Sequence, residues 1–575
     1  MRKEHGVDVV VVGSGGGGFR AAIAAAEKGC GVVLLSKGKA TRSGASPMAG
    51  GGLMGDIDTD GPSLKAMGFP KVDDSYTQDV WFKDIVLAGA YINNQKMVRR
   101  HIEESAGVVR ELIDWGASVF ERGAANALSI RGTDMMDVLQ KKALALGVSI
   151  VEDFFVTDVV SDGREASGCV GVDVHEGELV YWPARAVVIA TGGVHGLYRH
   201  NSGSTCCTGD GLAMAHRAGA DLMNMEMIEF CPDTVVLPEK MRGSIVTYVL
   251  SAYGGVDHRN AEGEAFIERY YQGKTLELAL NSEWNKMLCS YAMYKEGADT
   301  GGIRLKVCPE RLESAYQRRH YLKEKAGFFR EMSTWDIVTM PAAHYMAGGI
   351  AIDEKCASGV AGLYACGEAT AAVFGANRVS SALTEMLTLG KIAGEEAAVY
   401  ALSAAPTEDA ERAAALAAEN LAPFARQTTP APKDIFKAEH DLKETMHRNV
   451  NVAKSEKTLL AATADCSGLR ERLDAFALEG GPGKYNVPWI TWMNLRNMLP
   501  VAELMIASSL FRKESRGVFV REDKFFTDNA NWLKCTVVTP DGKLTTADPD
   551  LSELRPDFDR LDYFDAVNHL AERAG

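Results

Sequence analysis

The first residues of the chain alternate between patterns typical of strands and of helices. Val7–Val12 is β-branched apart from Asp8, which predicts a strand buried on both faces. A glycine-rich stretch, Gly13–Gly18, follows, and the Ala-rich residues Phe19–Lys28 predict a helix. Val32–Leu35 predicts a second short strand. Together these elements form a βαβ unit of roughly 30 residues.

Further runs extend this α/β pattern along the chain. Residues Gln78–Phe120 show helical periodicity, and Ser149–Val172 contains short β-rich runs. Ala186–Ala190 predicts another buried strand, which ends at the turn Thr191–Gly193. A helix is expected over Asp210–Ala218. The pattern therefore predicts a parallel sheet with covering helices.

The middle of the chain departs from this pattern. Residues from about Glu226 to Met340 are mixed and rich in aromatic side chains and Met, which indicates an inserted domain. Strand and helix patterns return from Gly349 to Ala405. Pro430 and Pro432 lie in a linker, and amphipathic helices are expected on either side of position 480. A helical domain therefore follows the α/β part.

Composition narrows the function. The 575 residues, of which 46% are hydrophobic, are enough for roughly two to four structural units. A formal net charge of -15 argues against nucleic acid as a partner, because phosphates would be repelled. No apolar run of about 18 residues occurs, so no transmembrane segment is expected. The N-terminus leads directly into a strand, so we expect a cytoplasmic location, with membrane contact only through partner subunits.

Cysteine spacing bears on electron transfer. The 11 cysteines include no C-x-x-C pair, and Cys206 and Cys207 are adjacent. This is not the spacing of an iron–sulfur cluster, and no metal site is predicted. If the chain passes electrons onward one at a time, a separate protein must receive them.

The glycine-rich turn has the spacing of a dinucleotide site. Gly13, Gly15 and Gly18 form G-x-G-x-x-G between a buried strand and a helix. The first permits the tight turn, the second lets the backbone approach a pyrophosphate, and the third allows close packing of helix on strand. The second strand ends in Ser36-Lys37, where NAD sites carry an acidic residue. A flavin nucleotide is therefore favoured over NAD.

Motifs in the correct order over nearly the whole chain resemble the succinate dehydrogenase and fumarate reductase flavoprotein family. L-aspartate oxidase and adenylylsulfate reductase are related members. The motifs that carry the resemblance are Ser36-Lys37, Thr41-Arg42-Ser43, Gly50-Gly51-Gly52, Ala190-Thr191-Gly192-Gly193, Thr208-Gly209-Asp210-Gly211, His344-Tyr345 with Gly348-Gly349, Gly362–Glu368, Gly375-Ala376-Asn377-Arg378 and Arg512–Gly517.

The resemblance implies an α/β fold with a Rossmann-like FAD-binding domain. A capping domain of α+β type interrupts it, and a helical C-terminal domain follows. The expected bounds are 1–227 and 341–405 for the FAD-binding domain, 228–340 for the cap, 406–540 for the helical domain and 541–575 for a C-terminal tail. The expected cofactor contacts are Gly13, Gly15, Gly18, Ser36, Lys37, Ser43, Gly44, Gly51, Gly52, Ala190, Thr191, Gly192, Asp210, Glu368, Arg378, Ser381 and Leu383.

The resemblance also implies the reaction. Hydride would move between flavin N5 and a carbon of a small organic substrate, and an iron–sulfur or ferredoxin-like subunit would exchange electrons with the flavin. Respiratory members bind FAD covalently through a His, and Gly44 occupies that position here. Gly has no side chain to form the bond, so we expect noncovalent FAD.

The substrate positions depart from the family. Cys231 stands where the family has a carboxylate-binding His, and Thr247 is kept while Ser251 replaces an Arg. Glu283 aligns with the proton-donating Arg. His344 and Arg378 remain, as two cationic groups beside the flavin. Each lost charge-assisted hydrogen bond costs roughly 1.5–3 kcal/mol. We therefore expect a substrate other than a simple C4 dicarboxylate.

Several alternatives stay open at this point. Cys231 is a pocket wall, a packing thiol, or a nucleophile or acid. Glu283 is a proton donor or a solvated helix carboxylate, and Tyr248 or Tyr253 donates a proton or stacks on a ring. Rival functions are succinate/fumarate interconversion with a rearranged anion site, a reaction like that of adenylylsulfate reductase, and a flavoprotein that only relays electrons.

Overall fold

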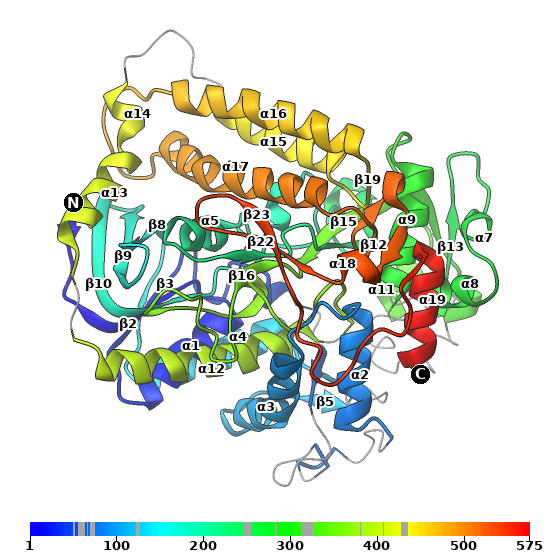
Figure 1. The fold of residues 1–575 in the computed structure, drawn as a ribbon, viewed down its shortest axis with the longest axis horizontal. Helices are drawn as coiled ribbons and strands as arrows, with labels where there is room; N and C mark the ends of the chain where they lie inside the picture. Colours follow the sequence, from blue (N-terminus) through cyan, green and yellow to red (C-terminus); the bar gives the residue numbers. More distant parts are fainter. Residues whose placement is uncertain are drawn as a thin grey trace.

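The fold of the chain is known from a computed structural model (Figure 1). It describes residues 1–49, 52–55, 64–65, 67–69, 75–121, 127–245, 255–281, 284–312, 326–379, 381–405, 408–426 and 435–574. The predicted site residues Gly51, Thr247, Tyr248 and Glu283 lie outside the described residues, as do Ser251 and Tyr253.

A mixed sheet forms the centre of the N-terminal half. Its strands follow the order β7-β3-β2-β10-β9-β8, and β1 and β17 also pair with β10. β2 lies parallel to β3 and β10, whereas β9 is antiparallel to β10. The bounds are β1 Arg2–Lys3, β2 Val7–Val12, β3 Val32–Leu35, β7 Ser149–Val151, β8 Phe154–Ser161, β9 Ala166–Asp173, β10 Glu178–Ile189 and β17 Leu363–Ala365. The predicted βαβ unit and the buried strand before Thr191 are confirmed.

Two helices pack together along this sheet. α1 (Gly16–Glu27) and α12 (Ala382–Ser403) lie side by side (Figure 1). Small residues allow the close approach: a Cβ atom on Gly394 would lie 2.2 Å from the Ala21 carbonyl oxygen. The remaining helices of this half are α2 (Gln78–Ala88), α3 (Gln95–Asp114), α4 (Gly132–Ala145) and α5 (Asp210–Arg217).

The middle of the chain builds a separate antiparallel sheet of order β12-β15-β14-β13. Its strands are β12 Ile228–Leu237, β13 Val256–Arg259, β14 Ile303–Val307 and β15 Ile337–Met346. The described α-helices of this region are α7 Ile267–Tyr270, α8 Gly273–Asn281, α9 Asn285–Gly297 and α11 Ala326–Met332. The start of β12 pairs with the end of β15, since Ile228 lies opposite Met346. This pairing brings the two ends of the insertion together.

Helices dominate the C-terminal part, where α15, α16 and α17 pack on one another (Figure 1). They are preceded by α13 and α14 and followed by α18 and α19. The bounds are α13 Ala410–Asn420, α14 Ala422–Ala425, α15 Ile435–Asn449, α16 Glu456–Ala475, α17 Val487–Phe511, α18 Asn529–Trp532 and α19 Tyr563–Ala574. None of the described helices is long and apolar enough to span a lipid bilayer.

Residues near the C-terminus also pair with strands from earlier in the chain. β22 (Cys535–Val538) and β23 (Leu544–Ala547) extend the order β18-β16-β11-β22-β23. The other strands are β11 Leu222–Met223, β16 Gly349–Ala351 and β18 Thr370–Ala371. The expected C-terminal tail, residues 541–575, contains short regular elements, among them β23 and the helix α19.

Candidate active site

The glycine-rich turn has the geometry of a phosphate-binding loop. Gly13 has a φ of +112° and Gly15 is the residue that precedes α1. A Cβ atom on Gly18 would lie only 1.9 Å from the Gly13 carbonyl oxygen, so only glycine fits there. The first turn of a helix presents free N–H groups and partial positive charge, which suit a pyrophosphate. At this turn the Gly16 N–H donates to Ser46 Oγ over 3.0 Å.

Predicted cofactor residues from the second strand meet other motifs. Ser36 Oγ lies 2.6 Å from Ser14 Oγ in the glycine-rich turn. Lys37 Nζ donates to Asp210 Oδ2 over 2.7 Å and to Asn494 Oδ1 over 2.6 Å. These bonds join β3, α5 and α17. The structure thus brings Lys37 and Asp210 together, and their contact with the cofactor stays a prediction.

The segment expected to run past the flavin has free space around Gly44, the position at which respiratory members of the family carry the flavin-linked His. Gly44 has a φ of +82°, and a Cβ atom there would meet no heavy atom within 4 Å. Ser43 Oγ donates to the Lys39 carbonyl oxygen over 2.7 Å. Ser381 Oγ donates to the Gly52 carbonyl oxygen and begins α12, whose first turn contains the buried Leu383. No side chain at position 44 can therefore bond covalently to a flavin.

Several buried polar atoms have no hydrogen-bond partner among the described residues. They include Thr191 Oγ1, both amide atoms of Asn377 and Glu385 Oε2. A buried polar atom without a partner costs about 1–3 kcal/mol, which a bound polar group would relieve. The nitrogen, oxygen and hydroxyl groups of FAD fit such donors and acceptors. Beside them, Ala190 and Gly192 flank Thr191 at the end of β10.

Glu368 lies close to these groups. Its Oε1 accepts a hydrogen bond from the Met346 N–H over 3.0 Å and lies 3.5 Å from His195 Nδ1. A Cβ atom on Gly193 would lie 2.1 Å from the same oxygen, so the glycine makes room for the carboxyl. Burial and the neighbouring Glu368 raise the pKa of Glu385 to about 8. Glu385 is therefore a hydrogen-bond donor near neutral pH.

The substrate side is built around a buried carboxylate, Glu229 on β12. Arg378 Nη2 lies 3.0 Å from Glu229 Oε1, and Lys286 Nζ on α9 lies 3.3 Å from the same oxygen. Lys286 also donates to the Arg378 carbonyl oxygen over 2.8 Å. His344 Nε2 on β15 lies 3.9 Å from Glu229 Oε1. We call these four residues the Glu229 cluster.

The charges of the cluster differ from the expectation at one residue. Burial lowers the pKa of His344 to about 3, so its imidazole is neutral near pH 7. This differs from the cationic His344 that the sequence predicts; its Nδ1 lies 2.7 Å from Ser202 Oγ, within hydrogen-bond distance. Burial alone would raise the pKa of Glu229, but Arg378 and Lys286 lower it below its usual value. Glu229 thus stays ionised, and the cluster carries a net charge of about +1.

Cys231 follows Glu229 on the same face of β12. Its side chain is fully buried, and burial together with the Glu229 charge raises the pKa of the thiol. A protonated, inaccessible thiol is a poor nucleophile. Of the three roles considered for Cys231, the packing or wall roles fit this environment and the nucleophile does not.

Two residues of the cluster were missed by sequence reasoning. Glu229 lies two positions before Cys231, and of these two residues only Cys231 aligns with a substrate-binding residue of the family. Lys286 stands before the apolar Met287-Leu288-Cys289, where a lone Lys gives little signal. The useful signal was a charged residue within an apolar stretch, since Lys and Glu are almost never fully buried unless paired.

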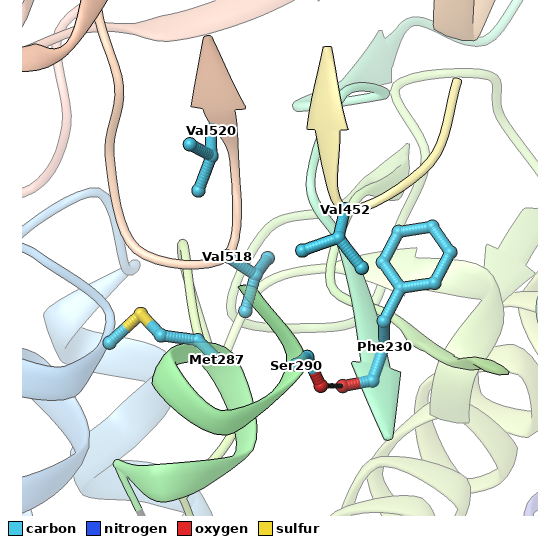
Figure 2. Close-up of a pocket in the computed structure, with 6 residues that line it drawn as sticks. All are labelled: Phe230, Met287, Ser290, Val452, Val518 and Val520. Atoms are coloured by element: carbon cyan, nitrogen blue, oxygen red, sulfur yellow. Dashed lines mark hydrogen bonds between the residues drawn. The ribbon is translucent and has the colours of Figure 1, made fainter. Parts of the chain in front are cut away.

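A small pocket lies where β12, α9 and the segments around Val452 and Val518 meet (Figure 2). Figure 2 shows Phe230, Met287, Ser290, Val452, Val518 and Val520 around it. Its one polar lining side chain is already bonded, because Ser290 Oγ donates to the Phe230 carbonyl oxygen over 2.9 Å. Since side chains alternate along a strand, Phe230 faces this pocket and Glu229 faces away from it. The pocket is therefore distinct from the candidate active site.

The phosphate-binding loop, the buried polar atoms and the charged cluster define an FAD-dependent oxidoreductase. The chain belongs to the FAD binding domain family, which matches residues 8–383. Residues 439–561 match the fumarate reductase flavoprotein C-terminal family. The predictions of an enzyme of the succinate dehydrogenase and fumarate reductase flavoprotein type, and of FAD as its cofactor, are confirmed.

Known proteins similar to the chain span several activities. A fumarate reductase (CoM/CoB) subunit from Methanothermobacter marburgensis is 29% identical, over 90% of this chain and 94% of its own length. L-aspartate oxidase from Streptomyces coelicolor is 28% identical, over 96% of this chain and 94% of its own. The solved structure of Mycobacterium smegmatis Sdh1 with UQ1 has a TM-score of 0.81 and 27% identity, and covers 97% of this chain and 96% of that one. The predicted fold class is confirmed. The names of these relatives span more than one substrate.

Proposed function

We propose that this flavoprotein oxidises or reduces a small organic substrate with one anionic group, which is not a simple C4 dicarboxylate. The bound FAD supplies hydride transfer at N5. The observation that carries the proposal is the ion pair between Glu229 and Arg378, whose Nη2 and Oε1 atoms lie 3.0 Å apart. The carboxylate of Glu229 is thus paired with Arg378, the cation that the resemblance assigns to a substrate carboxylate.

Charge balance supports this substrate class. Arg378 and Lys286 together carry two positive charges, Glu229 carries one negative charge, and His344 is neutral. A monoanion would match the charge of about +1 that these four side chains carry, whereas a dicarboxylate would exceed it. A second substrate carboxylate would be repelled by Glu229, since two like charges 4 Å apart repel by about 4 kcal/mol at an effective dielectric constant of roughly 20. The second carboxylate of succinate therefore needs cations from elsewhere.

The roles of the cluster residues follow from their contacts. Arg378 orients the anionic group, and His344, held by Ser202, offers Nε2 as a neutral hydrogen-bonding group. Lys286 fixes the Arg378 backbone and shares the charge of Glu229. Glu229 and Lys286 are buried, which strengthens their interaction, whereas Arg378 and His344 are partly exposed and so accessible to a substrate. The chain thus supplies position and charge to the reaction.

The proposal includes noncovalent FAD and an iron–sulfur partner. Gly44 has no side chain for a flavin bond, so denaturing the protein should release all the flavin into solution. Among the described cysteines only Cys206 is exposed, which gives no surface cluster for iron–sulfur ligation. Protein purified with its native neighbours should contain an iron–sulfur subunit. A yellow protein that never co-purifies with one would contradict the partner proposal.

A test compares the chain with Glu229→Gln in fumarate reduction by a reduced dye. The variant removes the negative charge of Glu229 beside Arg378 and Lys286, so fumarate should bind at least about tenfold more tightly, equal to about 1.4 kcal/mol. Glu229→Asp keeps the charge and is the matched control, and flavin content checks that each protein is folded. Fumarate turnover with a low KM in the unaltered chain, unchanged in Glu229→Gln, would favour succinate/fumarate interconversion instead.

A further inference from the structure

A second buried cluster lies beyond the Glu229 cluster on the same two elements. Asp233 follows Glu229 by four positions on β12, and Cys289 follows Lys286 by three positions, one helical turn, on α9. His258 on β13 completes the group. All three side chains are buried, with exposed fractions of 0% for Asp233, 7% for His258 and 0% for Cys289. No step of the proposed reaction uses them.

The three side chains converge on one point. One atom from each residue, a carboxylate oxygen, an imidazole nitrogen and a sulfur, lies within 4.8 Å of the other two. Asp233 Oδ1 lies 2.8 Å from His258 Nε2. Asp233 Oδ2 is also buried and has no hydrogen-bond partner among the described residues. A fully buried carboxylate oxygen without a partner in the protein is the kind of atom that a bound water or ion satisfies.

The chain bends to form this arrangement. The pairing of β12 with β15 shifts register between Cys231 and Thr234, and Asp233 has a φ of +55°. This bulge re-aims the Asp233 side chain at the facing strand and helix. The cluster thus joins three elements that are far apart in sequence.

We propose that Asp233, His258 and Cys289 bind a zinc ion, with water in the fourth position. Thiolate, imidazole and carboxylate are the side-chain ligands of zinc, and four ligands at about 2.0–2.3 Å surround it tetrahedrally. Such ligand atoms are about 3.5 Å apart. The Asp233 and His258 atoms, now 2.8 Å apart, would separate slightly, and atoms up to 4.8 Å apart would move closer. A thiolate excludes magnesium and calcium, which take oxygen ligands.

The charges of the site favour a divalent cation. On binding, Cys289 loses its thiol proton to solvent, and His258 binds as the neutral imidazole. The thiolate and the Asp233 carboxylate together carry two negative charges, which balance the zinc ion in a buried place. The ion would tie β12 and α9, the elements of Glu229 and Lys286, to β13. It would hold the substrate side together without entering the hydride transfer.

The experiment measures metal content in the intact flavoprotein. Protein produced with zinc in the medium and dialysed against a weak chelator should keep about one zinc per chain, as tight structural sites do. Cys289→Ala and Asp233→Asn should each retain less than about a tenth of that amount. Cys169→Ala, at a buried cysteine of the central sheet, is the matched control and should keep the zinc. Zinc absent from the unaltered protein, or unchanged in both site variants, would overturn the proposal.

A second measurement works without variants. Replacing the metal of the unaltered protein with cobalt should give the red-region absorption of tetrahedral cobalt, where flavin is transparent, and a thiolate-to-cobalt band. Cobalt spectra typical of six oxygen ligands, or no bound cobalt, would show that the cluster is only a hydrogen-bonded core group. Neither readout depends on the substrate, so the zinc proposal and the proposed function fail separately.

Discussion

Glu385 illustrates how a single residue ties the fold to the cofactor. It lies in the first turn of α12 and is 2% exposed. The burial raises the pKa of its carboxyl from 4.5 to about 8, with Glu368 adding to the effect. The folded protein therefore holds a proton on Glu385 that the unfolded chain releases.

This protonation predicts a pH dependence of stability. A raised carboxyl pKa stabilises the fold fully below pH 4.5, and this contribution is lost as the pH rises towards about 8. In flavin-free protein, Glu385→Gln should remove this pH-dependent loss of stability. The free energy of unfolding changes with a slope of at most about 1.4 kcal/mol per pH unit for one such group. Denaturant unfolding at several pH values measures it. Glu395→Gln, on the same helix, is the control; equal slopes in both variants would contradict the expectation.

At the residue scale, the sequence predicted the local motifs better than the distant contacts. Gly13, Gly15 and Gly18 are contiguous with their strand and helix, so their spacing carried the geometry. Lys286 and Arg378 are 57 and 149 positions from Glu229, and no periodicity encodes such pairs. Tertiary packing alone brings these three side chains together. The charge of His344 depends on its surroundings in the fold, which the sequence does not give.

At the scale of elements, the βαβ unit depends on how closely α1 approaches its sheet. Gly18 is the contact point, since a Cβ atom there would overlap the Gly13 carbonyl oxygen. A shift of α1 would move the N–H groups of its first turn, where the pyrophosphate is predicted to bind. The strand and helix patterns predicted this unit because each element is amphipathic or buried throughout.

Gly18→Ala should therefore lower the flavin content of the purified protein at least about tenfold, because overpacking displaces the helix. The absorption of the flavin relative to that of the protein measures it. Gly17→Ala is the matched control, since a Cβ atom at Gly17 meets its nearest neighbours at an ordinary 3.4 Å. If Gly18→Ala is as yellow as Gly17→Ala, the close approach does not control cofactor binding.

At the scale of the whole molecule, a buried ionic network joins the C-terminal part to the N-terminal half. Arg512 Nε donates to Glu226 Oε1 over 2.7 Å, and its Nη1 donates to Glu514 over 2.8 Å. Arg516 donates to Glu514 over 2.6 Å. All four side chains are at most 1% exposed. The expected bounds of the individual domains stay a prediction, whereas these contacts show that the parts share one buried network.

Breaking that network should destabilise the molecule strongly. Arg512→Ala removes the ion pair of the buried Glu226 and leaves the buried Glu514 with Arg516 alone, which costs about 3–5 kcal/mol in free energy of unfolding. Arg304→Ala removes an exposed pair with Asp336 and should change stability by less than about 1 kcal/mol. Denaturant unfolding of both variants, with and without FAD, compares them. Similar effects would show that the buried network adds nothing beyond a surface pair.

The pairing of β12 with β15 has a consequence for how such enzymes diversify. Leu237 and Val338 are neighbours across the ladder, although a hundred residues separate them along the chain. The polypeptide thus leaves and re-enters the parent fold through one two-stranded ribbon. A lineage can lengthen, trim or replace everything beyond that ribbon without changing the strand order of the nucleotide-binding sheet. New specificities can arise there while the redox machinery is inherited unaltered.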